Sequence, residues 1–375
     1  MFLQVTISYT DVTIIGAGAA GIGIAVQLTK LRIDFIILEK DSIGSSFKKW
    51  PKETRFISPS FTGNFFKMPD LNAITPDSSP AYTLLTEHPS GKEYATYLEN
   101  VAKHYEIPIK TGQQVKKLIK KEDLFEIQTQ NQTHKTKHLI WAAGEYQYKK
   151  QGNFKGSKHC THNSEIKSFK ELKGEEYIII GGYESGFDAA IHLAKTNKKV
   201  TLLDSHNHID LVNSDSSYSL SPYTRDQIKK QAEKIEYYTN ARVKEVKQNK
   251  QGYEVTLESS KKFQTKNKPI NATGFDSSLK LVKEHFEFEK DYPLLTEHDE
   301  STTTKNLYLT GPQVKHENAL FCFIYKFRQR FGIITKKIAE DLNVNKEEID
   351  ELVQELKEYN FYLEDLSCCE NECEC

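Results

Sequence analysis

Two glycine-rich loops of similar design constrain this chain more than any other feature. The first is Gly16-Ala-Gly-Ala-Ala-Gly21, and the second is Gly181-Gly-Tyr-Glu-Ser-Gly186. Each loop follows an apolar run and precedes a helical stretch. An acidic residue, Glu39 or Asp204, stands at the same distance in sequence after the first glycine of each loop. A strand, a glycine turn, a helix and an acid in this order form the fingerprint of a dinucleotide site. A chain with two such sites most simply passes electrons from one nucleotide to another.

The two loops are not equivalent in detail. In the first, Gly16 permits the tight turn, Gly18 lets the backbone approach a pyrophosphate, and Gly21 lets the helix pack on the strand. The second loop has Tyr183 at the position of closest approach, so it predicts a looser or differently angled dinucleotide, with a vestigial site as the alternative. Asp204 would repel a 2′-phosphate and modestly favours NADH over NADPH, without deciding between them.

Length and charge narrow the class of protein. The chain has 375 residues, which suggests two or three domains, and its net charge of −1 gives no electrostatic case for nucleic acid or an anionic membrane. No apolar run reaches the length of a membrane span, and the first ten residues lack a signal-peptide pattern. A cytoplasmic protein is therefore expected, with no nucleic-acid or membrane partner.

The order of the patterns predicts an α/β fold of two Rossmann-like nucleotide-binding domains, each with three layers of β/β/α type, the second inserted into the first. The strand before Gly311 and a helix expected at 321–342 have no glycine loop of their own, so they should complete the first domain. The aromatic, proline-rich stretch 40–90 should form a wall of the pocket. The predicted FAD-binding domain comprises residues 1–150 and 276–345, the NAD(P)-binding domain 170–275, and a C-terminal helix with a Cys-rich tail 346–375.

The six cysteines argue against a redox dithiol, because no Cys-x-x-Cys pair occurs. Four of them crowd the end of the chain, interleaved with acids, where they could hold a soft metal ion, although a disordered, dispensable tail is the preferred interpretation. His159-Cys-Thr-His162 does not follow a zinc-site spacing, so no metal site is predicted. The four tail cysteines are Cys368, Cys369, Cys373 and Cys375.

Further segments carry a resemblance to a known family. Together with the two loops, Trp141-Ala-Ala-Gly144, Ala272-Thr-Gly274 and Leu307-Tyr-Leu-Thr-Gly-Pro312 resemble the two-dinucleotide-binding flavoproteins, the pyridine nucleotide-dependent FAD oxidoreductases. Within them, Gly44-Ser-Ser-Phe-Lys-Lys-Trp50 resembles the Gly-Gly-x-Trp segment of the flavin-containing monooxygenase-like branch. The resemblance implies FAD in the first site and NAD(P)H in the second, with hydride passing from NAD(P)H to FAD and then to O₂ or a small-molecule acceptor.

The resemblance also implies the binding residues. Those expected at FAD are Gly16, Gly18, Ala19, Ala20, Gly21, Glu39, Lys40, Ser46, Phe47, Trp50, Val115, Ala143, Gly144 and Gly311. Those expected at NAD(P)H are Gly181, Gly182, Tyr183, Glu184, Ser185, Gly186, Asp204, Thr273 and Gly274. Asn64 resembles the amide that the monooxygenase-like branch keeps near the flavin and is the candidate catalytic residue, with a turn-capping role as the alternative.

Two departures from the family leave the electron acceptor open. The monooxygenase signature Phe-x-Gly-x-x-x-His is one residue short in Phe154-Lys-Gly-Ser-Lys-His159, and Ala20 stands where bacillithiol-disulfide-reductase-like proteins carry a cysteine. A monooxygenase-like enzyme is predicted. The alternatives are a reductase or oxidase of a disulfide, quinone or metal acceptor without oxygen insertion, or a flavin-bound sensor of metal or redox state. A small-molecule substrate is expected, and a homodimer is a state common in the family.

Overall fold

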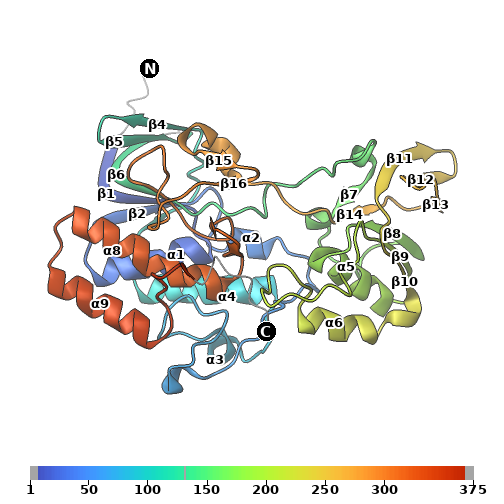
Figure 1. The fold of residues 1–375 in the computed structure, drawn as a ribbon, viewed down its shortest axis with the longest axis horizontal. Coiled ribbons are helices and arrows are strands. Elements are labelled where there is room, and N and C mark those ends of the chain that lie inside the picture. The colour runs from blue at the N-terminus through green and yellow to red at the C-terminus, as the bar shows by residue number, and fades with distance from the viewer. Residues whose placement is uncertain (1–6, 131, 368–375) are drawn as a thin grey trace.

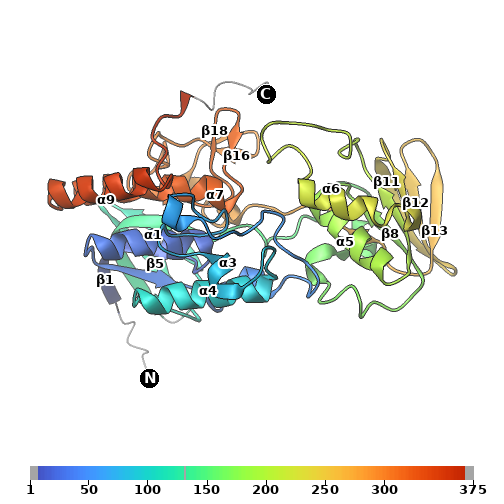
Figure 2. The same ribbon diagram turned by 90° about the horizontal axis from the view of Figure 1, so that it is seen from below.

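We describe residues 7–130 and 132–367 of the computed structural model. They form two lobes side by side along the longest axis of the molecule (Figure 1), and the same separation is visible after a 90° turn (Figure 2). The first lobe contains the amino-terminal part of the chain and returns with the last helices, while the second lobe contains the middle of the chain. Within the described residues, no helix has the length and apolarity that crossing a bilayer requires.

The first lobe is built on a sheet of order β3-β2-β1-β6-β5-β4, with β17 paired to the end of β6. β1 runs parallel to β2 and β6, whereas β4, β5 and β6 form an antiparallel meander. Val12 and Ile14 of β1 are fully buried because helices cover this part of the sheet. The strands are β1 (Ile7–Ile15), β2 (Phe35–Leu38), β3 (Ile109–Lys110), β4 (Lys117–Lys121), β5 (Leu124–Gln128), β6 (Thr133–Trp141) and β17 (Leu307–Leu309).

The helices of the first lobe approach one another closely at a small residue, and one of them has a well-formed N-terminal cap. α1 (Ala19–Lys30) contacts α4 (Gly91–His104) and α8 (Phe331–Asp341), and α8 in turn contacts α9 (Lys346–Glu358). A Cβ atom on Gly23 of α1 would lie 2.2 Å from the Phe331 ring, so glycine permits this close approach. α4 begins with a capping box: the Ser90 hydroxyl accepts from the Glu93 amide, and the Glu93 carboxylate accepts from the Ser90 amide.

The second lobe has three layers. Its parallel sheet has the order β10-β9-β8-β14-β7, and Ile179 on β8 packs toward α5 while its neighbours Ile178 and Ile180 pack toward a separate meander. This alternation follows from the two-residue period of a strand. The elements are β7 (Thr161–His162), β8 (Glu176–Ile180), α5 (Glu184–Lys195), β9 (Lys199–Leu203), α6 (Pro222–Lys229), β10 (Ile235–Tyr238), β14 (Ile270–Asn271) and the meander β11 (Val243–Asn249), β12 (Gly252–Leu257) and β13 (Lys262–Thr265).

The connectivity confirms the predicted α/β fold with one nucleotide-binding lobe inserted into the other. β17 follows the whole second lobe in the chain, yet it pairs in parallel with β6 of the first lobe. The domain boundaries drawn from the sequence stay predictions. The remaining short elements are α2 (Ser45–Lys48), α3 (Pro80–Leu84), α7 (Ile324–Phe327), β15 (Phe288–Glu289), β16 (Tyr292–Pro293), β18 (Lys315–His316) and β19 (Ala319–Leu320).

The helix predicted for 321–342 forms as a helical run from Ile324 to Asp341 that contains a 3₁₀ turn. The chain forms α7, a 3₁₀ turn over Arg328–Arg330, and then α8. Both arginines are buried: the Arg328 guanidinium donates to the carbonyl oxygens of Asp70 and Ala73, and the Arg330 guanidinium donates to the Asp299 carboxylate. A tighter turn lets both side chains reach these partners.

Candidate functional site

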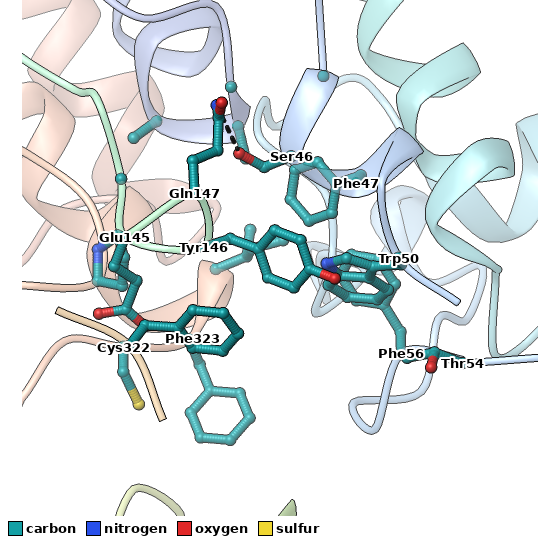
Figure 3. A pocket seen from close by; sticks show the side chains of 18 of the residues that line it. Ser46, Phe47, Trp50, Thr54, Phe56, Glu145, Tyr146, Gln147, Cys322 and Phe323 are labelled. Atoms are coloured by element: carbon teal, nitrogen blue, oxygen red, sulfur yellow. Dashed lines mark hydrogen bonds between the residues drawn. The ribbon is translucent and has the colours of Figure 1, made fainter. Parts of the chain in front are cut away.

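A cavity of about 380 Å³ lies where the two lobes meet. The first glycine loop lies in one part of its wall, and the start of α5, with Glu184 and Ser185, lies in another. Figure 3 shows Trp50 and Phe56 at one side, Glu145 and Cys322 at the other, and Tyr146 between them. The cavity therefore joins parts of both predicted nucleotide sites.

The glycines of the first loop serve different purposes. Gly16 adopts a φ of +108°, and a Cβ atom there would lie 2.6 Å from the Ala142 carbonyl oxygen. A Cβ atom on Gly21 would lie 1.9 Å from the Gly16 carbonyl oxygen. A Cβ atom on Gly18 would meet nothing within 4 Å, although Gly18 precedes the first residue of α1. The open space at Gly18, in front of the free N–H groups of a helix start, fits the pyrophosphate of FAD.

Glu39 lies directly after β2 and is held in place by the backbone. Its Oε2 accepts from the Ala17 amide at 2.8 Å, and its Oε1 accepts from the Asp41 amide at 2.8 Å. A carboxylate has about four lone-pair positions, so acceptor capacity for ribose hydroxyls remains. A smaller cavity of about 50 Å³ beside Glu39 is lined by Lys40 and Val115, which places both predicted residues next to this acid.

Aromatic rings form the wall beyond the glycine loop. The ring centroids of Phe47 and Trp50 are 5.3 Å apart, those of Trp50 and Phe56 5.1 Å, and those of Phe56 and Tyr94 4.4 Å. Gln147 donates from Nε2 to the Ser46 hydroxyl at 3.4 Å, the contact drawn as a dashed line in Figure 3. This wall is largely apolar, as the site of a flavin ring system requires.

Most of the residues predicted for FAD come together at this cavity. Gly21 and Gly311 lie behind it, where Gly311 approaches Ala20. Their roles toward FAD stay predictions, since the structure shows the protein alone. The predicted residues that line the cavity are Gly16, Gly18, Ala19, Ala20, Glu39, Ser46, Phe47, Trp50, Ala143 and Gly144.

Asp204, the acid of the second fingerprint, accepts hydrogen bonds from donors of the protein. Asp204 is fully buried and accepts from the amides of His206 and His208, both at 3.0 Å, and from the Tyr237 hydroxyl at 2.6 Å. The His208 ring also lies within hydrogen-bond distance of it. Burial alone would raise the pKa of Asp204, but these hydrogen bonds outweigh it and the pKa is lowered. Asp204 therefore holds the loop 205–208, and its predicted contact with a ribose stays a prediction.

Tyr183 ties down the segment that follows. Its hydroxyl donates to the carbonyl oxygens of Ser217 and Ser219, at 3.0 Å each. We call residues 213–219 the strap. The strap also reaches the first lobe, because Ser217 donates to the Leu320 carbonyl oxygen and Lys326 donates to Asp215. Tyr183 thus anchors an inter-lobe connection from the position where a glycine would face the pyrophosphate.

The other residues predicted for NAD(P)H are divided between cavity and interior. Glu184 and Ser185 line the cavity. A Cβ atom on Gly182 would lie 2.3 Å from that of Asp204, and one on Gly186 would lie 1.8 Å from the Gly181 carbonyl oxygen, so both glycines serve packing. Thr273 and Gly274 follow β14 and do not line the cavity. The Gly274 carbonyl lies 3.0 Å from Nε2 of His162.

Asn64 is not brought to the cavity, so its candidate catalytic role is not supported. Its Nδ2 donates to the carbonyl oxygens of Pro76 and Ser78, at 2.6 and 3.1 Å. The amide thus fastens one end of the segment 64–78, which is the turn-forming alternative. The physical reason is that a short side chain within a turn finds backbone acceptors nearby.

Among the described residues, one group of side chains has the spacing of possible metal ligands. The ligand atoms of Asp204, His206 and His208 lie within 4.8 Å of one another. Hydrogen bonds already occupy Asp204 and join it to His208, so this group is explained by loop structure. The predicted tail of four cysteines lies outside the described residues.

Sequence reasoning missed several cavity residues, above all Glu145 and Cys322. Burial raises the pKa of Glu145 to about 7, and a hydrogen bond with Gln313 opposes this shift. Burial also raises the pKa of the Cys322 thiol, whose sulfur lies 3.1 Å from the Ser217 hydroxyl. Glu145 directly follows Ala-Ala-Gly144, so its position next to a predicted binding residue indicates that it lies near the cavity. No sequence pattern around Cys322 indicates its place in the cavity wall.

Comparisons with known proteins agree with this architecture. The sequence pattern of the family described as pyridine nucleotide-disulphide oxidoreductase matches residues 13–311. The chain belongs to this family. Membership confirms the expected class, an oxidoreductase, and the expected cofactors, FAD and NAD(P)H.

The relatives and structural neighbours of the chain have names that point to different activities. The chain is 31% identical over 202 residues to an uncharacterized oxidoreductase, CzcO, of Bacillus velezensis, covering 52% of this chain and 54% of the relative. It is 29% identical over 195 residues to a probable indole-3-pyruvate monooxygenase, YUCCA1, of Arabidopsis thaliana, covering 49% and 44%. These alignments span only about half of each relative.

A solved structure shows the fold over a greater length. Bacillithiol disulfide reductase Bdr of Staphylococcus aureus superposes with a TM-score of 0.73 at 20% identity, covering 89% of this chain and 99% of that one. At this identity the match shows the fold alone. The monooxygenase branch expected from the sequence is therefore not confirmed, because both reductases and monooxygenases are similar to the chain.

Proposed function

We propose that this protein is an NAD(P)H-dependent FAD oxidoreductase that passes electrons directly to a small planar acceptor, without a thiol relay. FAD, when bound, supplies the hydride chemistry. The residues of the chain bind and orient it: Gly18 and the start of α1 at the pyrophosphate, Glu39 at the ribose, and Trp50 with its aromatic neighbours around the ring system.

The composition of the cavity wall carries this proposal. Trp50, Phe56, Tyr146 and Phe323 line the same space that Gly18 opens into. Among the described lining residues Cys322 is the only cysteine, and the pKa of its thiol is raised by burial. Thiol–disulfide exchange requires a thiolate, so Cys322 is poorly suited to it. Aromatic side chains instead favour stacking with a flat acceptor.

The test separates acceptors after anaerobic reduction. The FAD-loaded protein is reduced under argon with NADH or NADPH and then mixed with menadione or with cystine in a stopped-flow spectrophotometer. We expect menadione to reoxidise the flavin at least about tenfold faster than cystine. Reoxidation by cystine with no response to menadione would contradict the proposal, and no reduction by either nicotinamide would contradict the whole electron path.

A second candidate is a flavin monooxygenase, favoured by the likeness to the Arabidopsis protein and by the largely apolar wall. Oxygen insertion needs a reduced flavin that meets O₂ in a cavity closed to water. Admitting O₂ to the reduced protein should then give a long-lived absorbance that differs from both the reduced and the oxidised spectra. Direct return to the oxidised spectrum with release of peroxide supports the first candidate. The small-molecule substrate, the lack of nucleic-acid or membrane partners, the cytoplasmic location and the homodimer stay predictions.

A further inference from the structure

We propose that Glu145 is the acid of this cavity, donating a hydrogen bond and, during turnover, a proton to the oxygen of a carbonyl-bearing acceptor such as a quinone. This inference rests on the proposed function, because it names the class of acceptor that the same cavity takes. It is carried by the position of Glu145, by its partners, and by comparison with the other acids of the wall.

The backbone places Glu145 at the inner end of the first sheet. β6 ends at Trp141, and Gly144 then adopts a φ of +63°, a left-handed conformation that glycine allows. The next residue, Glu145, extends into the cavity on the same side as Cys322 and Phe323 (Figure 3). Its side chain is accessible from the cavity, while protein surrounds its other sides.

Each of the other acids of the cavity wall has a different task. Glu39 accepts from the amides of Ala17 and Asp41. Glu184 accepts from the Ser221 amide and the Thr224 hydroxyl, both at 2.5 Å. Asp188 accepts from the Thr54 hydroxyl at 2.6 Å and lies 3.2 Å from Nε2 of His192. Glu39 is assigned to the ribose, and Glu184 and Asp188 serve the structure of the protein. Glu145, whose partner is Gln313, is therefore the acid of the wall that remains for an acceptor.

The surroundings of Glu145 favour its protonated form. Its hydrogen-bond partner is Gln313. The side-chain carbonyl of Gln313 accepts from the Ser277 hydroxyl, and this second bond fixes the orientation of the Gln313 amide group. The titratable neighbours are Cys322 and Tyr292, for both of which Glu145 adds a repulsive charge. Lys326, the cation closest in sequence to Cys322, is bound to Asp215 and to the Ser217 hydroxyl. Burial raises the pKa of Glu145 to about 7, so its protonated form is favoured far more than for an exposed glutamate.

A protonated carboxyl here would complete the reduction of a quinone. FAD, when bound and reduced, would supply a hydride, that is, one proton and two electrons, to the quinone. The hydroquinone oxygen that still lacks hydrogen takes its proton from Glu145, so the carboxyl O–H bond breaks as the new O–H bond forms. A proton from bulk solvent, delivered through water in the cavity, then restores the carboxyl group. Atoms, charge and electrons balance with one solvent proton consumed for each quinone reduced.

Binding of a quinone gives a first readout that does not depend on turnover. With the oxidised, FAD-loaded protein, 1,4-naphthoquinone is titrated by calorimetry between pH 5.5 and 8.5. We expect the wild-type affinity to fall as the pH rises through about 7, because the donor is lost. Glu145→Gln keeps an amide donor and should bind without this pH dependence, whereas Glu145→Ala should bind several-fold more weakly below pH 7. Glu233→Gln, an exposed acid on the second lobe, is the matched control.

Infrared and kinetic measurements complete the test. A protonated carboxyl band that titrates near pH 7 should be present in wild type and absent in Glu145→Gln. In anaerobic reoxidation, Glu145→Gln should slow menadione at least about tenfold and leave ferricyanide, which takes up electrons without protons, unchanged. If menadione fails to reoxidise the wild type, the proposed function fails and this inference with it. If menadione works but binding, band and rate are the same in Glu145→Gln and wild type, only the role of Glu145 is overturned.

Discussion

At the scale of single residues, Gly18 and Gly21 show how one motif contains two kinds of glycine. A side chain at Gly18 would extend into open space, so the protein itself does not need glycine there. A side chain at Gly21 would overlap the Gly16 carbonyl oxygen, so the turn itself excludes it. The two positions therefore separate ligand binding from folding.

We predict opposite results for Gly18→Val and Gly21→Val. Gly18→Val should fold with nearly unchanged thermal stability but bind FAD at least about tenfold more weakly, because the side chain fills the place of the pyrophosphate. Gly21→Val should lose about 3 kcal/mol of folding free energy or more, because overpacking forces the backbone apart. Thermal unfolding of the FAD-free protein and FAD titration measure the two effects. Equal loss of stability in both variants would contradict this division.

The sequence predicts the residues of the first site well and those of the acceptor end poorly. Gly18 and Glu39 belong to one local strand–turn–helix–strand unit, so their spacing alone determines that they meet. Glu145 and Cys322 come from distant parts of the chain and meet only because β17 and the segment before α7 return to the first sheet. Asn64 lies away from the cavity because its amide donates to the carbonyl oxygens of Pro76 and Ser78, which a glycine-and-acid pattern does not reveal.

At the scale of elements, the strap links the second fingerprint to the first lobe. Tyr183 holds it from one side through Ser217 and Ser219, and Lys326 holds it from the other through Asp215. The only local hint of this role is a tyrosine at a loop position where glycine is usual. The pattern of glycines and acids predicts the strand, helix and strand around it, but gives no information on what the loop after Asp204 contacts.

We predict that Tyr183→Phe loosens the strap. The substitution leaves two carbonyl oxygens without their donor and should weaken this connection by roughly 1 kcal/mol, because a single hydrogen bond contributes about that much. Hydrogen–deuterium exchange should rise in residues 213–221 by several-fold and stay unchanged in β8 and β9. Tyr82→Phe, at an exposed tyrosine, serves as the control. Unchanged exchange in the strap would show that Lys326 and Asp215 alone fix it.

At the scale of the whole molecule, the lobes touch on more than one side of the cavity. Besides the strap, the segment 52–54 of the first lobe contacts the second lobe through Glu53, which accepts from the Ser168 hydroxyl at 2.6 Å and the Phe169 amide at 2.9 Å. Thr54 donates to Asp188 on α5. The repeated fingerprint predicts two lobes and the insertion of one in the other, but such contacts depend on how the lobes pack and have no periodic signal.

The contact at Glu53 should weaken in mild acid. Burial tends to raise the pKa of this carboxyl, but the hydrogen bonds from Ser168 and Phe169 outweigh it and lower the pKa below its ordinary value of 4.5. A group whose pKa is lowered on folding contributes stability above its unfolded value, and this contribution is lost as the pH falls through the folded value. Limited proteolysis of residues 163–171 should therefore accelerate below pH 4.5 in wild type. Glu53→Gln should already be susceptible at pH 7 and change less with pH.

The late return of β17 has a consequence for how the chain is made. During synthesis the inserted lobe, up to β14, is translated while β6 still lacks β17 and α1 still lacks α8. The apolar surface of α1 that α8 later covers stays exposed throughout the translation of the inserted lobe. A nascent chain with an exposed helix of this kind is a natural client for chaperones, and rare codons between β14 and α8 would lengthen its exposure.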